Sequence, residues 1–281
     1  MLMNARGSIQ GEIREIEQCP TREVCPLGSL CGVSRKGYGK PLFPVVRKVE
    51  KGELIWTTLR FENQVVVVRK GVFVSIGTGE QEEAVPFALL GKGNAAGLAE
   101  AYTPSEVSEY YHIRTLIEGE ICTLPAKVVR RKLEELPQVT SHQVICCSFI
   151  SQSISSFTQT KIVSKKSLYE RILALLLYLQ DMTSRQDVEH TTLEITHEEI
   201  SMLVASDRAS VTRVLHKMSG DGILSIGYKS IMLHNDKLAK HRAEHDSHIC
   251  FVTPKEESEH LKGASLLTPR CDKEDESFIL L

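Results

Sequence analysis

The sequence predicts an α+β protein that consists of a small antiparallel β-domain, a long helix and a winged helix-turn-helix. Short apolar runs separated by glycine-rich turns predict the β-domain. An apolar repeat with alternating spacings of three and four residues predicts the long helix. Two short helical segments followed by a hairpin pattern predict the winged motif. With 281 residues, the chain is long enough for about two domains.

The order of these patterns divides the chain into five segments. Residues 1–35 are polar, carry three cysteines, and contain prolines and glycines that disfavour a continuous helix. The β-domain is expected over 36–125, and a short helix followed by the long helix over 126–163. Residues 164–240 carry the winged motif. The last segment, 241–281, is acidic and poor in apolar residues, so we expect it to be mostly disordered.

The composition is that of an ordinary globular protein rather than a membrane or secreted one. Apolar residues make up 42% of the chain and charged residues 25%, with 34 basic and 36 acidic side chains. The longest apolar run, over 172–179, is far shorter than the roughly 18 residues that cross a bilayer. The first residues also lack the basic and apolar stretches of a secretory signal. We therefore expect a cytoplasmic protein with no membrane partner.

The long helix carries a candidate dimer interface. Pro137 can begin the helix, because the missing N–H of proline costs nothing at the first helical position. The repeat, which is typical of a seam between two helices, runs through Thr140, Gln143, Cys147, Ile150, Ile154 and Phe157. The last four of these residues are predicted to pair two chains; a core-facing helix of a single chain is the alternative. Ile145 and Phe149 form a separate apolar edge that we expect to face the β-domain.

Local signals define the winged motif. Thr196 and Glu199 have the spacing of a capping box, in which each side chain bonds the other residue's free backbone N–H, so a helix should begin there. A second helix is expected over 207–218 and should end at the glycines that follow it. Residues 223–226 and 231–233 alternate in polarity around a turn, which predicts a hairpin.

Basic residues are concentrated in this motif. Residues 205–242 contain seven basic and three acidic side chains, an excess that suits contact with phosphates. The first turns of the second helix would face the major groove of DNA, where an arginine can discriminate a guanine by about 1–3 kcal/mol. The predicted DNA-binding residues are Arg208, Ala209, Ser210, Thr212, Arg213 and Lys217. Ordinary solvated positions for Arg208 and Arg213 are the alternative interpretation.

The segment 196–233, with the sequence SDRASVTRVL over 206–215, resembles the DNA-binding domain of the Crp–Fnr superfamily of bacterial transcription regulators. The resemblance extends in order through the whole chain except the tail: a β-roll sensor domain of the kind that binds cyclic nucleotides, a dimerisation helix and the winged domain. It implies a homodimer on a two-fold-related DNA site, with RNA polymerase as a further expected partner. The sequence shows no nucleophile–base pair, phosphate-cradling glycine loop or paired carboxylates at helical spacing, so no enzymatic activity is expected. A glutamate is common in the family at the position of Ala209, so a different target sequence is expected.

Four of the eight cysteines form a candidate metal site. In a reducing compartment, cysteines more often serve ligation or redox chemistry than a disulfide framework. An iron–sulfur cluster needs about four thiolates, and the candidates are Cys19, Cys25, Cys31 and Cys122. This layout resembles the oxygen-sensing Fnr branch, which also has an N-terminal trio and one central cysteine, and the resemblance implies a 4Fe-4S cluster. Two ligands of that trio are usually two residues apart in the branch, whereas both gaps here are five residues.

These features together predict a homodimeric DNA-binding regulator that senses oxygen, nitric oxide or redox state. Ligation of the cluster would order the N-terminal segment beside the dimer helix and favour the DNA-competent pair. A zinc site, a thiol–disulfide switch, unrelated thiols, and control by a small organic ligand or haem are the alternatives. Cyclic AMP is not expected, because no arginine for its phosphate lies between Arg69 and Arg114. An iron–sulfur electron carrier would leave the winged motif unexplained.

Overall fold

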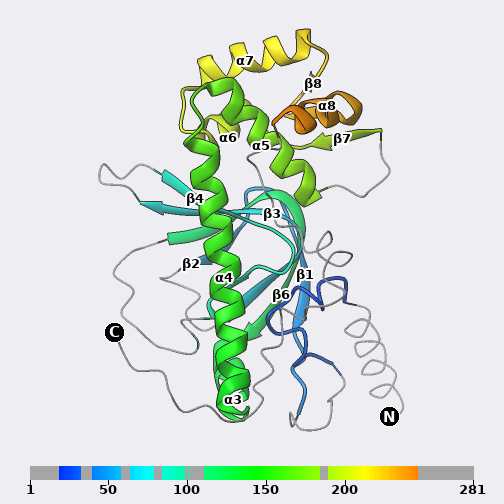
Figure 1. Cartoon of the computed structure of the whole chain (residues 1–281). Coiled ribbons are helices and arrows are strands. Elements are labelled where there is room, and N and C mark those ends of the chain that lie inside the picture. Colours follow the sequence, from blue (N-terminus) through cyan, green and yellow to red (C-terminus); the bar gives the residue numbers. More distant parts are fainter. Residues whose placement is uncertain are drawn as a thin grey trace, which may run out of the picture. The chain divides into compact units, whose positions relative to one another are not determined.

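The computed structural model describes residues 19–32, 40–57, 64–78, 84–98, 101, 111–183 and 189–245. Within these ranges the expected α+β architecture is confirmed, with a β-rich N-terminal part and a C-terminal part of helices around a small sheet (Figure 1). None of the described helices is long and apolar enough to cross a membrane. The expected disorder of the acidic tail falls almost entirely on 246–281, which lie outside the described residues.

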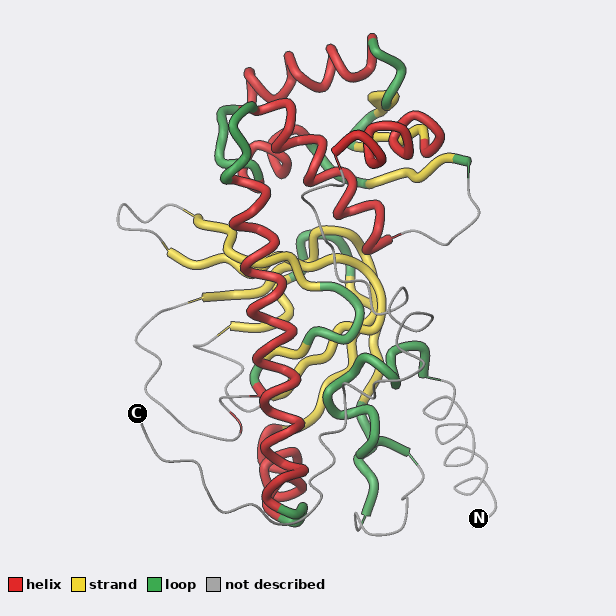
Figure 2. Tube along the Cα trace, viewed as in Figure 1, coloured by secondary structure: helices red, strands yellow, loops and turns green. Residues whose placement is uncertain are grey.

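The β-domain is built on two long antiparallel strands. Its described strands, in chain order, are β1 (Val45–Val49), β2 (Leu54–Thr57), β3 (Gln64–Thr78), β4 (Ala84–Leu90), β5 (Ala95–Ala96) and β6 (Tyr111–Pro125). β3 pairs with β6 along most of its length, β1 and β2 also pair with β6, and β4 and β5 pair with β3. Figure 2 shows these strands in one curved body.

Both faces of β3 are buried, which explains the continuous valine run in its sequence. Successive side chains of a strand point to opposite faces. Val65 and Val67 therefore enter one apolar cluster, whereas Val66 and Val68 enter another. The first cluster also includes Leu27, which comes from the segment that precedes the strands. Residues 19–32 thus contribute side chains to the core of the β-domain.

The helices that follow β6 agree with the expected order. α3 (Ala126–Glu134) begins directly after the strand, and α4 (Gln138–Val163) is the predicted long helix, with Pro137 as its N-cap residue. α5 (Leu168–Thr183) follows after a short turn. α4 lies against β4 of the β-domain, as can be followed in Figure 1.

The two faces of α4 have the reverse polarity of an ordinary surface helix. Ser148 and Ser155 are buried on the side that faces the β-domain. The predicted seam is instead exposed in the single chain, through Cys147, Ile150 (56% exposed), Ile154 (47%) and Phe157 (60%). A row of exposed apolar side chains over a buried polar face is typical of a helix that packs on a partner helix.

One expectation for α4 is wrong. Phe149 is 66% exposed and does not face the β-domain. Ile145, the other residue of the same expected edge, does pack against the core. Adjacent residues of a helix are about 100° apart around its axis. Because Ser148 occupies the buried face, the side chain of Phe149 points to solvent.

The C-terminal part contains two short helices and a small sheet. The helices are α6 (His197–Leu203) and α7 (Arg208–Gly220), and the sheet has the order β7-β9-β8, with β7 (His190–Leu193), β8 (Leu224–Gly227) and β9 (Ser230–His234). The predicted hairpin is β8 and β9. The polar sequence of β7 does not predict a strand, but its backbone pairs with β9. α8 (Asn235–His245) continues past residue 241, so the first residues of the expected disordered tail are helical.

Candidate functional site

The segment 19–32 folds into consecutive turns that place three cysteines beside the β-domain. The backbone N–H of Cys25 donates to Thr21 O at 2.8 Å, and that of Gly28 donates to Cys25 O at 2.9 Å. A side chain at Gly28 is excluded, because its Cβ would lie 2.0 Å from Arg22 O. The fully buried side chain of Leu27 anchors these turns in the core.

The fourth cysteine comes from the sheet. Cys122 lies on β6, opposite Val46 of β1 and Val67 of β3, and is 8% exposed. All four candidate ligands, Cys19, Cys25, Cys31 and Cys122, line one cavity that is partly open to solvent. The wall around them is largely apolar and includes both valines. The fold therefore brings together thiols that lie far apart in the sequence.

The environment of the cavity favours the protonated form of three of its thiols. Burial raises the pKa of Cys25 and Cys31 to about 12 and that of Cys122 to about 11. Neighbouring thiols contribute to these raised pKa values, whereas Arg22 acts to lower the pKa of Cys31 and Arg69 acts to lower that of Cys122. A metal that binds here must displace these protons.

The thiols are distributed around the wall of the cavity. Within the described ranges, no three side chains of His, Cys, Asp or Glu lie close enough to share a single metal ion. Arg22 and Arg69 are also among the residues that line the cavity. The arrangement therefore places four soft sulfur donors around one space, with two positively charged residues close to the thiols.

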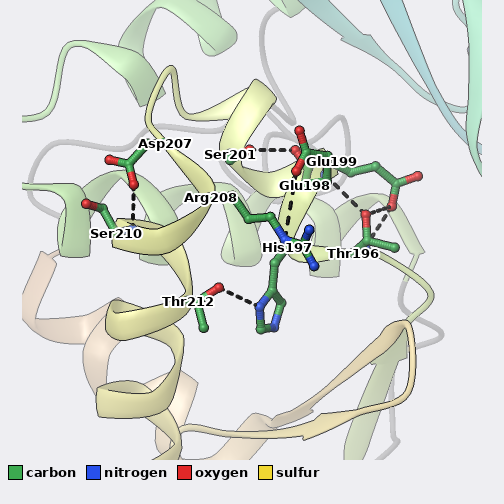
Figure 3. A network of polar contacts seen from close by, with 9 residues as sticks. All are labelled: Thr196, His197, Glu198, Glu199, Ser201, Asp207, Arg208, Ser210 and Thr212. Carbon is green, nitrogen blue, oxygen red and sulfur yellow. Dashed lines mark hydrogen bonds and ion pairs between the residues drawn. The ribbon is translucent and has the colours of Figure 1, made fainter.

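The second candidate site is α7, which local contacts position. The capping box predicted from the sequence is present: Glu199 N–H donates to Thr196 Oγ1 at 3.2 Å, and Thr196 N–H donates to Glu199 Oε2 at 2.7 Å (Figure 3). Asp207 caps α7 by accepting a hydrogen bond from Ser210 N–H at 2.8 Å. This hydrogen bond lowers the pKa of the Asp207 carboxyl group. The turn between the helices passes through Ala205, whose φ is 50°.

The predicted DNA-binding residues lie along the outer side of α7. The side chains of Arg208, Ala209, Arg213 and Lys217 are exposed, and those of Ser210 and Thr212 are half-buried. Arg213 Nη2 donates to Ser210 Oγ at 2.9 Å, and the ammonium of Lys217 lies 5.6 Å from the ring centre of Tyr169. The opposite side of α7 is buried through Val211, Leu215 and Met218. α7 thus presents a basic surface on a helix that is fixed from behind.

Two residues of α6 contact this surface and are not found by sequence reasoning. His197 Nδ1 lies 3.0 Å from Thr212 Oγ1, and Glu198 Oε2 lies 3.8 Å from Arg208 Nε (Figure 3). Burial lowers the pKa of His197, and the nearby His216 and Arg208 lower it further. The sequence feature that could have pointed to these two residues is their position in the first turn of a capped helix. Their contacts depend on how α6 crosses α7, which no local pattern states.

The wing is a tight hairpin with an exposed tip. Gly227 of β8 pairs with Ser230 of β9, so Tyr228 and Lys229 form the turn. Tyr228 is 89% exposed, and the Lys229 ammonium lies 5.5 Å from its ring centre. The tip therefore presents an aromatic ring and a positive charge to solvent.

Comparison with known proteins identifies the C-terminal part. Residues 170–240 match the Crp-like helix-turn-helix domain family. The global nitrogen regulator of Synechocystis sp. is 23% identical over 208 residues, which cover 73% of this chain and 92% of that protein. The global nitrogen regulator of Nostoc sp. is 22% identical over 193 residues, which cover 68% of this chain and 86% of that protein.

Solved structures share the fold over about 70% of this chain. A CRP-family transcriptional regulator from Thermus thermophilus has a TM-score of 0.57 at 20% identity, covering 70% of this chain and 95% of that one. FixK2 from Bradyrhizobium japonicum has a TM-score of 0.54 at 16% identity, covering 71% and 97%. Residues 170–240 are therefore a Crp-like helix-turn-helix domain, a DNA-binding domain, joined to a β-domain in the fold of the Crp/Fnr regulators.

Proposed function

We propose that this protein is a homodimeric transcription regulator whose affinity for a two-fold-related DNA site is controlled by an iron–sulfur cluster. The cluster, expected in the 4Fe-4S form, is held by Cys19, Cys25, Cys31 and Cys122. RNA polymerase is a further expected partner, and the cytoplasm is the expected location. The observation that carries the proposal is that four thiols, three from the N-terminal turns and one from β6, line one cavity.

The donor set of the cavity suits this group. Iron–sulfur clusters are bound by cysteine thiolates, and hydrogen bonds and charges around the sulfurs tune them. The cavity is lined by four cysteines together with Arg22 and Arg69, in a mostly apolar wall. When bound, the cluster would supply iron–sulfur bonds that oxygen or nitric oxide can break.

The packing provides a physical route from the cysteines to the dimer helix. Leu27 of the N-terminal turns shares one apolar cluster with Cys122, with Leu133 of α3, and with Val144 of α4. Ligation of the trio to Cys122 would hold Leu27 in this cluster. Loss of ligation would leave the turns without their metal bonds and weaken the support of the first part of α4. Binding and ordering are then coupled through the core.

The exposed face of α4 supports the dimer. Ile150, Ile154 and Phe157 are each about half exposed in the single chain, on a helix whose other face is buried. A second copy of α4 would cover these three side chains. The two-fold axis of the resulting dimer would also relate its two copies of α7. Paired recognition helices read two half-sites about one helical turn of DNA apart.

The cluster is tested by metal analysis of the full-length chain. The protein is purified without oxygen, and its iron, acid-labile sulfide and visible absorption are measured. We expect a brown protein with comparable iron and sulfide, and loss of both in Cys122→Ser. The matched control is Cys146→Ser, because Cys146 is exposed on α4 and does not line the cavity.

Other outcomes would replace the proposed cofactor. A colourless protein with stoichiometric zinc would assign the cavity to a zinc site. A metal-free protein that forms disulfides among the four cysteines in air would assign it to a thiol–disulfide switch. The DNA-binding part of the proposal is tested separately. A binding sequence is first selected from random DNA with the wild-type protein. The affinity of the protein for that sequence is then measured before and after exposure to air. Equal affinities would contradict control by oxygen.

A further inference from the structure

Arg69 places an unused hydrogen-bond donor at the wall of the four-cysteine cavity. The residue lies on β3, two residues after Val67, and both residues line the cavity. The Arg69 side chain is only 12% exposed. Its Nε is fully buried and has no hydrogen-bond acceptor among the described residues.

The acidic neighbour of Arg69 does not accept a hydrogen bond from this N–H. Glu120 Oε2 lies 3.9 Å from Arg69 Nη1, beyond hydrogen-bond distance, and the Glu120 side chain is 35% exposed. A different arginine shows what a satisfied pair looks like in this domain: Arg47 on β1 donates directly to Glu53 near the surface. Arg69 is therefore held with its positive charge close to the thiols and its Nε–H available.

The strand geometry keeps Arg69 in this position. β3 and β6 change register between Val68 and Lys70, so Arg69 lies at an irregularity in the ladder. Irregularities of this kind re-aim a side chain and interrupt pairing. On the partner strand, Glu120 and Cys122 are two residues apart and share a face. One cation and one anion thus lie next to the cysteine that the sheet contributes.

We propose that Arg69 is a positioning residue that donates its Nε–H to a sulfur atom of the occupied cavity and sets the reduction potential of the cluster. This inference rests on the proposed function and adds to it the residue that tunes the cofactor. Hydrogen bonds to cluster sulfurs and the net local charge are the protein's means of setting such potentials. A nearby cation favours the more negative, reduced form, so Arg69 raises the potential. Glu120 opposes it.

The test compares variants of opposite expected sign in the anaerobic, cluster-loaded protein. Arg69→Gln should lower the midpoint potential of the cluster by at least about 59 mV, which corresponds to a tenfold change in the equilibrium constant of a one-electron reduction. Glu120→Gln should shift it upward. Arg69→Lys keeps the charge but loses the planar Nε–H, so its potential should lie between those of the wild type and Arg69→Gln. Arg47→Gln is the control and should match the wild type, because Arg47 does not line the cavity.

The outcomes separate this inference from the proposed function. A wild-type protein without iron and sulfide overturns the proposed function and this inference with it. Loaded Arg69→Gln and Arg69→Lys proteins with wild-type potentials overturn this inference alone. If Arg69→Gln does not retain iron and sulfide, the potential of Arg69→Lys decides. A second measurement is the half-life of the visible absorption of the cluster in air. It should change in the Arg69 variants and stay at the wild-type value in Arg47→Gln.

Discussion

The helix-turn-helix and the four-cysteine cavity are built in different ways. In the helix-turn-helix, the bonds that define the geometry join residues three positions apart, as between Thr196 and Glu199 or between Asp207 and Ser210. In the cavity, turns at the start of the chain meet a strand that lies much later, and Leu27 and Cys122 share one apolar cluster. Local hydrogen bonds thus cap the helices of the first site, whereas the second site exists only where segments far apart in the chain pack together. Substitutions should therefore act differently in the two regions.

The largest expected effect comes from truncating one buried leucine in each region. Leu27, beneath the cysteine turns, and Leu215, behind α7, are both fully buried. Each Leu→Ala change should lower the free energy of unfolding by about 2–5 kcal/mol, because buried methyl groups are lost and a cavity remains. Urea unfolding followed by circular dichroism measures this loss.

The same pair of variants tests whether each region binds its own ligand independently: the cluster in the cavity, and the DNA backbone at α7. Leu27→Ala should lower the iron content of anaerobically purified protein and leave the binding of random-sequence DNA near the wild-type value. Leu215→Ala should weaken DNA binding and leave the iron content unchanged. Equal losses of both properties in both variants would contradict the distinction between a long-range and a local site.

The two regions also differ in how far they could be predicted from the sequence. The capping box and the hairpin follow from local spacing, because each bond joins residues that are close in the chain. The four cysteines could be grouped from the number of thiolates that a cluster needs and from resemblance to a family, but not from local spacing. Arg69 could not be added to them, since its place depends on an irregular pairing of β3 with β6. The expectation for Phe149 is wrong because the sequence period shows which residues share a helix face, but not what that face packs against. β7 was missed because pairing with β9 outweighs its polar sequence.

α4 connects the two regions, and charging its exposed face should separate the subunits. Ile154→Glu would place a carboxylate between two apolar helices in the dimer. An unpaired buried charge costs about 3 kcal/mol or more, which is over a hundredfold in the dimer dissociation constant. Sedimentation velocity should show monomers. Thr160→Glu is the matched control, because Thr160 is exposed about 120° away around the helix, and it should remain dimeric. A dimeric Ile154→Glu protein would place the interface elsewhere.

If α7 contacts bases, removing one of its arginines should have a smaller effect, which is confined to the affinity for the specific DNA sequence. Arg213 is exposed and is oriented by Ser210. Arg213→Ala should weaken binding to the sequence selected by the wild type by about 1–3 kcal/mol. Binding to random DNA should weaken much less. Lys240→Ala, on α8, removes an exposed cation away from α7 and should lower both affinities by the same small factor. Unchanged specificity in Arg213→Ala would assign Arg213 to the phosphates.

The smallest effect concerns the turn between α6 and α7, where the local site carries backbone strain. Ala205 has a φ of 50°, in the left-handed region that disfavours a side chain. Ala205→Gly should raise the free energy of unfolding by about 0.5–1 kcal/mol. Gly222 gives the opposite test, since its φ is 72° and an added Cβ would meet nothing within 4 Å. Gly222→Ala should therefore lower the free energy of unfolding by a similar amount, through backbone strain alone. Thermal unfolding of the two variants should shift in opposite directions without a change in iron content. A destabilised Ala205→Gly protein would show that flexibility gained by the unfolded chain outweighs the relief of strain at this turn.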